Sequence, residues 1–542
     1  MNRRSAPSHP ARPPRLNHVF SVAFLLFAVA IGSACAGPMI GVPNSAERAG
    51  AAKEAPDWVE RGGSSPRFQT NRYLIGFAQA LDSEDALESA KQLATADLAR
   101  QISVQIESSV VDITKEIDGD IENDLTSQIR ATSDIRLEGV RFETYRKRKK
   151  VWALAILERL PAAVARRKQR DQALALTRLC LTDAEREEQA GHSTRALDIY
   201  RGCRTPLDTA LEHEAVAAAL SRTGLLSDQA SKTLVQHAAQ IDRRVRAIPH
   251  EDAHSIRIAA EGLATQLARA GVGRGQQITV APFLYQSRDV SSPFGREIAI
   301  ALESALGSAD PTRTNSTKAT ATGLRAHSVV VRGSYHEVED RFQLRATAKE
   351  SGTGRLLASA EIAITSTGIP KNIKVRPPNF EAYADTADKL SGGDVVSGDL
   401  RIEIRTNKGI RGLVFDEGEE LRIFVRVNHP AWIRLIYVLT NGEHVPIEGA
   451  WYIDNSLVNQ LVEYPVAFEI VAPFGVEMIH GMAHTEKPDM LLTHRTRIEG
   501  QDYQVISEGA NQVVRQRGIA RKQKKQVAEQ TLQVTTMRAR EN

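Results

Sequence analysis

The stretches Tyr73–Ala78 (YLIGFA) and Ala86–Leu98 (ALESAKQLATADL) decide the fold class at the start of this chain. The first is a short apolar run, which is typical of a buried strand. The second repeats apolar residues at helical spacing, and Asp82 or Ser83 in front of it is a suitable N-cap. A strand that leads into an amphipathic helix predicts a unit in which the helix packs on a sheet.

Further strands of the same unit are predicted downstream of this helix. Apolar residues alternate in Ile102–Ile106 and again in Ile135–Phe142, and a continuous apolar run follows at Val151–Leu157. Alternation with a period of two is the pattern of a half-buried strand. We therefore expect residues 56–160 to form an α+β domain in which one helix covers an antiparallel sheet.

The rest of the chain divides into further segments, because 542 residues are too many for a single core. Residues 161–268 have a helical pattern and are expected to form a spacer or a partner-binding arm. Residues 275–367 follow the order strand, helix, three strands, which predicts a second small α+β domain. A Gly- and Pro-containing linker at 368–398 precedes alternating strands at 399–537. The expected fold class is multidomain α+β, with a helical spacer and a C-terminal β-sandwich.

Residues 1–36 have the layout of a bacterial secretory signal. Arginines precede an apolar run from Val19 to Ile31, which is too short to span a bilayer permanently. Small residues before Cys35 suggest a lipobox, in which that cysteine is lipidated, whereas ordinary cleavage after Ala36 is the alternative. The protein is then expected on the outer membrane facing the periplasm, or free in the periplasm. Residues 37–55 are expected to form a flexible tether.

The charge balance argues against a nucleic-acid partner. The formal net charge of +4 equals the charge of the four arginines in the predicted signal, so the mature chain is neutral overall. Nucleic-acid-binding domains normally carry a basic excess. We therefore expect partners among the proteins of the envelope, with peptidoglycan or another glycan as a further possibility and the membrane reached through the lipid anchor.

Two of the three cysteines are placed to form a disulfide. Ala163–Gln189 is predicted to be one helix and a second is predicted to begin at Ser193, with Gly191 between them as a helix stop. Cys180 and Cys203 lie equally far from that turn, so two antiparallel helices place them at the same height. An oxidising compartment favours the disulfide. Two free buried thiols are the alternative.

A helix over residues 292–306 offers a candidate surface for a protein partner. Ser292 is a suitable N-cap and Pro293 stands at the first helical position. Three residues, Arg296, Ile300 and Glu303, are expected to face outward. An exposed aliphatic residue between charges suits a small protein–protein contact, and a solvated helix face is the alternative. The residues expected to face the sheet are Phe294, Ile298, Leu302 and Leu306.

Two segments resemble known envelope families. Pro56-Asp57-Trp58, the strand Tyr73–Ala78 and the alanine-rich helix from Ala86 resemble the LPP-20-type lipoprotein domain, which FlgP shares. The strand Gln277–Phe283 followed by Ser291–Arg296 is similar to the FlgO-type domain and to the N-terminal domain of TolB. The resemblances imply an envelope lipoprotein that binds other proteins and has no active site.

The C-terminal segment resembles domain of unknown function 4384, a β-sandwich module. The matching pieces are Gly418-Glu419, Ile436-Tyr437 with the hairpin signal Asn441-Gly442, and Pro473–Gly475. No chemistry is assigned to that family, so the resemblance implies a fold and no catalytic residue.

The sequence predicts no enzyme activity, no cofactor and no metal. It contains no Walker loop and no G-x-S-x-G motif. His480 and His484 lie in a predicted strand, where residues four apart are separated by about 13 Å, too far to share one metal ion. Gly271–Gly275 precedes a strand, whereas a nucleotide-binding loop follows one.

These features together predict a non-enzymatic envelope lipoprotein that acts as a scaffold or assembly factor through protein–protein contacts. One alternative is an outer-membrane regulator of a peptidoglycan synthase. Another is the binding of cell-wall glycan by the β-sandwich, where aromatic side chains can stack on sugars or fill the core. Those side chains are Trp432, Trp451, Tyr452 and Tyr464.

Overall fold

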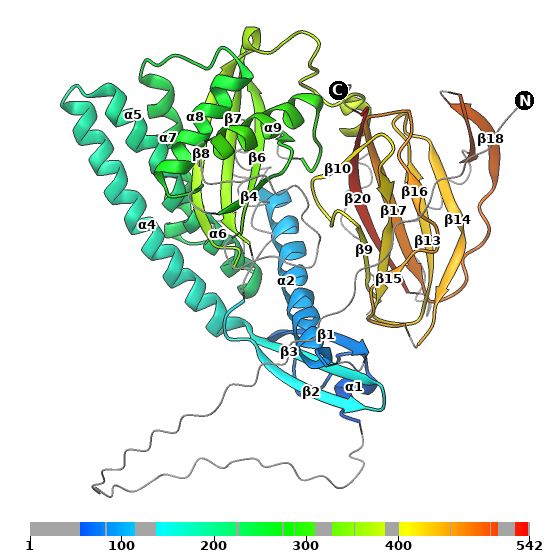
Figure 1. The fold of residues 1–542 in the computed structure, drawn as a ribbon. Coiled ribbons are helices and arrows are strands. Elements are labelled where there is room, and N and C mark those ends of the chain that lie inside the picture. Colours follow the sequence, from blue (N-terminus) through cyan, green and yellow to red (C-terminus); the bar gives the residue numbers. More distant parts are fainter. Residues whose placement is uncertain are drawn as a thin grey trace, which may run out of the picture. The chain divides into compact units, whose positions relative to one another are not determined.

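The described part of the chain has a mixed α+β architecture, as the sequence predicts (Figure 1). The predicted signal segment with Cys35, the predicted tether except Ala55, and the second part of the predicted linker lie outside the described residues. None of the described helices is both long and apolar enough to cross a membrane. The computed structural model describes residues 55–81, 84–113, 137–223, 227–273, 276–286, 288–308, 328–351, 353–384, 400–455, 457–498, 500–507 and 526–539.

The first sheet is antiparallel and has the strand order β1 (Tyr73–Leu81), β3 (Lys150–Glu158), β2 (Arg141–Lys147). Helix α2 (Ala86–Ile113) covers one face, as expected. Gly76 permits this contact, because a Cβ there would lie 2.0 Å from the Ala94 carbonyl oxygen. Trp58 of α1 (Asp57–Glu60) packs against Phe77, with the ring centroids 6.1 Å apart.

The strand predicted at Ile102–Ile106 is wrong, because α2 continues through these residues to Ile113. Ile102 and Ile106 are four residues apart and continue a buried row of the same helix that begins at Ala90, Ala94 and Leu98. In a strand every second side chain lies on the same face, and in a helix side chains four residues apart do so. Ile102 and Ile106 therefore share a face in either element, and this short apolar pattern did not distinguish strand from helix.

Four helices follow the first sheet and share one apolar core with it. They are α4 (Arg159–Gln189), α5 (Ser193–Gly202), α6 (Arg204–Ser221) and α7 (Gln229–Ala247). Cys180 of α4 and Cys203, between α5 and α6, form a disulfide with their Cα atoms 5.6 Å apart. Arg159 fixes the start of α4, because its guanidinium donates to the carbonyl oxygens of Thr70 and Tyr73.

The second sheet has the strand order β4 (Gln277–Val280), β6 (Ser328–Val338), β7 (Arg341–Glu350), β8 (Leu356–Thr365), and β5 (Leu284–Tyr285) also pairs with β6. A short 3₁₀ helix, η2 (Ser366–Gly368), follows β8. Helix α9 (Pro293–Ser308) covers one face of the sheet, and α8 (Ile256–Arg269) joins it in the same core. The boundary predicted for the spacer at residue 268 lies within α8, one residue before its end, so the predicted spacer includes a helix that packs on this sheet.

The opposite face of the second sheet is polar and is buried against α6. Side chains alternate along a strand, so Ser359 and Glu361 of β8 point away from α8 and α9. Glu361 lies 3.1 Å from Arg204 of α6, and the Ser359 hydroxyl donates to Asp208 of α6 at 2.6 Å. Lys349 of β7 pairs with Glu212 at 3.1 Å. Charged contacts thus attach the helical segment to the sheet.

The C-terminal segment is a β-sandwich, in which two sheets enclose one apolar core. One sheet has the order β10 (Leu413–Asp416), β20 (Val527–Met537), β17 (Val476–His484), β13 (Ala431–Val438), β14 (His444–Ile453). The other has the order β15 (Val462–Glu463), β12 (Ile423–Val427), β9 (Ile402–Thr406). Two short pairs complete the segment, β11 (Glu420–Leu421) with β16 (Phe468–Glu469) and β18 (Thr493–Ile498) with β19 (Gln501–Ile506).

Candidate interaction surface on helix α4

Helix α4 packs on its neighbours with one narrow face. Ala163, Leu174, Leu181 and Ala184 are buried on this side, where α4 contacts α6 along much of its length. Their spacings are close to whole numbers of helical turns, so they form one continuous row. The inner face of α4 therefore has the pattern expected for a helix of a bundle.

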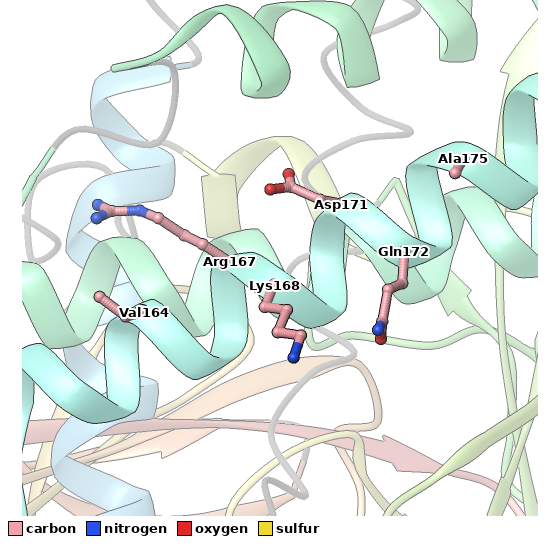
Figure 2. A pocket seen from close by; sticks show the side chains of 6 residues that line it. All are labelled: Val164, Arg167, Lys168, Asp171, Gln172 and Ala175. Carbon is pink, nitrogen blue, oxygen red and sulfur yellow. The ribbon is translucent and has the colours of Figure 1, made fainter.

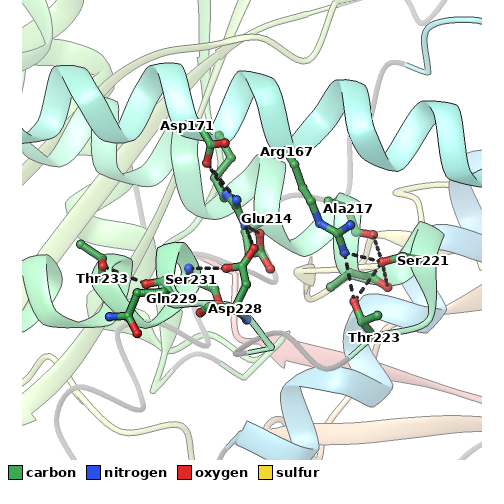
Figure 3. Close-up of polar contacts among 12 residues, drawn as sticks. Arg167, Asp171, Glu214, Ala217, Ser221, Thr223, Asp228, Gln229, Ser231 and Thr233 are labelled. Atoms are coloured by element: carbon green, nitrogen blue, oxygen red, sulfur yellow. Dashed lines mark hydrogen bonds and ion pairs between the residues drawn. The ribbon is translucent and has the colours of Figure 1, made fainter.

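Two arginines strengthen this inner contact (Figure 3). Arg170 donates to Glu214 of α6 at 2.5 Å and to Asp228, the N-cap residue of α7, at 2.8 Å. Arg167 donates to the hydroxyl of Ser221 at the end of α6, at 3.0 Å. One turn of α4 thus holds the C-terminal half of α6 and the start of α7.

Carboxylates outnumber cations around Arg170. Its guanidinium also pairs with Asp171 at 2.8 Å, so three carboxyl groups, those of Asp171, Glu214 and Asp228, surround one charge. Burial by itself would lower the pKa of Arg170, but the hydrogen bonds to these groups outweigh it and raise that pKa. Burial raises the pKa of Glu214. Asp171 is the member of this cluster that reaches the surface, with its side chain 57% exposed.

The outer face of α4 carries large aliphatic side chains that no described part of the chain covers. Leu160, Val164, Leu176 and Leu179 are 66%, 56%, 59% and 64% exposed. Together with the exposed Ala175 they form what we call the outer stripe. Figure 2 looks onto this face, where a shallow hollow of about 550 Å³ is lined by Val164, Arg167, Lys168, Asp171, Gln172 and Ala175.

The outer stripe makes α4 apolar on two sides. A surface helix normally has one apolar face, which it buries. In α4 the inner face supplies the core contacts with the described elements, and the outer stripe takes no part in the core that these residues form. The stripe has two apolar ends, Leu160 with Val164 and Ala175 with Leu176 and Leu179, and exposed apolar patches mark interaction sites. The signal was present in the sequence as a second row, from Leu160 to Leu179, beside the row that contains Leu174 and Leu181.

Two of the three residues predicted as a partner surface on α9 are exposed, and the third forms an ion pair with another element. Ile300 is 40% exposed and Glu303 is exposed, as expected. Arg296 instead pairs with Asp416 of β10 at 2.6 Å and donates to the carbonyl oxygen of Arg538. The helix period was correct, but the β-sandwich residues that meet Arg296 are more than a hundred positions away in the sequence.

The histidines do not form a metal centre in the described ranges. His480 and His484 lie on β17, and His480 Nδ1 is 2.9 Å from the hydroxyl of Thr531. The stretch His250–His254 (HEDAH) fits the H-E-x-x-H pattern of zinc proteases, which requires a helix. Here it precedes α8, and Ala253 bridges to Ile364 of β8. Among the described residues no three His, Cys, Asp or Glu side chains gather as a metal site.

The aromatic side chains of the β-sandwich divide into two groups. Tyr464 is buried and Trp451 packs against it, with the ring centroids 5.8 Å apart. Tyr452 is 46% exposed, and its ring centroid lies 4.9 Å from that of the half-buried Trp432. The Lys487 ammonium lies 5.2 Å from the centre of the Trp432 ring. Trp432 and Tyr452 therefore form a partly exposed aromatic pair on the sheet.

Comparison with known proteins adds no family to this geometry. No protein-family model matches the chain, and no curated protein matches it.

Proposed function

We propose that this protein is an exported, non-enzymatic cell-envelope lipoprotein that acts as a scaffold through protein–protein contacts. The signal-like residues 1–36 and the small residues before Cys35 support export and lipidation. The resemblances to envelope lipoprotein families support the same assignment. The lipid would hold the chain at the outer membrane, so that its folded part faces the periplasm.

The observation that carries the scaffold function is the outer stripe of α4. Its four large side chains are each more than half exposed although they stand on a helix whose other face is fully packed. Covering such a surface with a partner removes apolar area from water, which favours association. Binding rather than catalysis is the chemistry that this surface supports.

Chemical crosslinking in intact cells tests this function. We expect the wild-type chain to appear in crosslinked species of higher mass that Leu179→Asp reduces. Leu492→Asp is the matched control, because Leu492 is 77% exposed but lies outside α4. Equal crosslinking of the wild type and of Leu179→Asp would contradict a role of the outer stripe in binding proteins.

The anchoring part of the proposal has a separate test. Labelled fatty acid should be incorporated into the wild-type chain, and Cys35→Ala should abolish the label. A mature N-terminus at Gly37 would show that the chain is cleaved after Ala36 and carries no lipid.

A second candidate function, glycan binding, is favoured by Trp432 and Tyr452. A partly exposed aromatic pair next to the Lys487 ammonium offers a platform on which a sugar ring can stack. We expect soluble peptidoglycan fragments to quench the tryptophan fluorescence of the wild type, and Tyr452→Ala to weaken that binding. The same titration curve for both proteins would exclude this platform.

A further inference from the structure

We propose that the outer stripe of α4 binds a second copy of this chain, whose own α4 runs antiparallel to the first across a two-fold axis. The inference rests on the proposed function and deepens it, because it names the partner of the same surface.

Four of the five members of the outer stripe are symmetric about the point between Gln169 and Arg170, whereas the counterpart of Leu176 is Ala163 on the buried inner face. Leu160 and Leu179 lie equally far from this point, and so do Val164 and Ala175. When two antiparallel helices cross there, residues at equal distances from the centre lie at the same height. Leu160 of one copy then meets Leu179 of the other, and Val164 meets Ala175. A two-fold interface requires such a self-complementary surface, and each contact occurs twice.

The charged residues in the middle of the stripe follow the same symmetry. Lys168 and Asp171 are equidistant from the centre, so Lys168 of each copy lies at the height of Asp171 of the other. Lys168 has no ion-pair partner among the described residues. Asp171 belongs to the carboxylate-rich cluster around Arg170, which favours a second cation. Parallel helices in register would instead place Lys168 against Lys168, so the charges select the antiparallel arrangement.

The length and the position of α4 suit this contact. From Leu160 to Leu179 the helix rises about 30 Å at 1.5 Å per residue, which provides several turns of interface. Helices α6 and α7 contact the inner side of α4, and Figure 1 shows α4 along the outside of this layer. A small residue opposite a larger one, as with Ala175 and Val164, allows the two helices to approach closely.

Sedimentation velocity on the purified full chain tests the association. A Cys35→Ala background excludes the lipid and a free thiol there. We expect a dimer that dissociates on dilution, and Leu179→Asp should raise its dissociation constant by about 100-fold or more, since two buried leucine contacts are lost per dimer. Leu492→Asp should sediment as the wild type does. A wild-type chain that is monomeric at every concentration would overturn the proposal.

Mixed variants test the antiparallel register. In the same background, Val164→Cys and Ala175→Cys chains should form a disulfide-linked dimer when mixed and oxidised. Neither should do so alone, because equivalent positions in the two copies lie about 16 Å apart along the axis. Likewise, Lys168→Asp chains should pair better with Asp171→Lys chains than either variant pairs with itself. Crosslinking of Val164→Cys with itself would show a parallel dimer and overturn the two-fold antiparallel model.

The two proposals fail in different ways. If Leu179→Asp removes crosslinked species in cells but the purified chain is a monomer, the surface binds a different protein and the dimer is refuted. If the purified chain dimerises as described while Leu179→Asp removes from cells only the crosslinked dimer and no species that contains another protein, the scaffold function of this surface is refuted and the dimer stands.

Discussion

Glu361→Gln should loosen the attachment of α6 to the second sheet. Glu361 is 2% exposed on β8, and its Oε2 atom lies 3.1 Å from Arg204 Nε and 3.2 Å from Arg345 Nη2. Burial alone would raise the pKa of Glu361, but the two guanidinium groups outweigh burial and hold it below its usual value. The carboxylate thus compensates two buried cations at once.

The size of the effect follows from what glutamine leaves behind. The amide has nearly the same shape, so no cavity forms, but Arg345 and Arg204 each lose an ion pair with this carboxylate, while Arg204 keeps its ion pair with Asp242 of α7. Removing one partner of a buried ion pair costs about 3–5 kcal/mol. Because Asp242 remains, we expect the lower end, about 3 kcal/mol, which corresponds to an opening equilibrium about 100-fold larger.

Hydrogen exchange measured by mass spectrometry is the suitable assay. The four tryptophans are Trp58, Trp152, Trp432 and Trp451, so tryptophan fluorescence does not report on α6 or β8. Peptides from these two elements should exchange about 100-fold faster in the variant at pH 7. Glu261→Gln is the matched control, because its carboxylate pairs with Arg257 in a largely exposed ion pair of α8, worth less than about 1 kcal/mol.

Two results would refute this reasoning. The first is unchanged protection of α6 and β8 in Glu361→Gln, or a change no larger than that in Glu261→Gln. The second concerns pH. A carboxyl group whose folded pKa is lowered stabilises the fold above its unfolded pKa, and this contribution disappears as the pH falls through the folded pKa. The difference between wild type and variant should therefore shrink in acid below about pH 4.5, and a constant difference would contradict the charge argument.

Three further predictions concern other parts of the molecule. Replacing Cys180 and Cys203 by alanine should destabilise α4 and α5 by about 3 kcal/mol, since the disulfide closes a loop with a sequence separation of 23; unchanged amide exchange in these helices would contradict this. Burial raises the pKa of Glu477 in β17 to about 7, so the folded state binds an extra proton between about pH 4.5 and 7 and the wild-type sandwich loses stability as the pH rises through that window. Glu477→Gln should remove this loss, so above pH 7 the variant should be about 3 kcal/mol more stable than the wild type. Urea unfolding followed by tryptophan fluorescence measures this difference, and wild-type and variant stabilities that change in parallel with pH would disprove it. Ile300→Asp should keep the melting temperature within a few degrees, because this side chain is 40% exposed, and should reduce the envelope proteins crosslinked to the chain; a large loss of stability would show that Ile300 is a core residue.

Local patterns determined much of the fold. The three strands predicted after the helix of residues 292–306 are present as β6, β7 and β8, and the predicted inner residues of α9, such as Phe294 and Leu302, are fully buried. Equal distances from a helix turn also identified the cysteines that form the disulfide. These features were predictable because they depend on the spacing of residues within one or two neighbouring elements.

Tertiary structure decided which faces are covered. The spacing of α4 gives two apolar rows, but the contacts that select the inner one, such as Arg170 with Glu214, join residues 44 positions apart. The ion-pair partner of Arg296 is Asp416, and the polar face of β8 is buried by Arg204 and Asp208 of α6. Periodicity states that a helix or strand has a face, whereas the burial of that face is set by segments that meet only in the folded chain. The outer stripe therefore becomes a candidate interface only once its neighbours are in place.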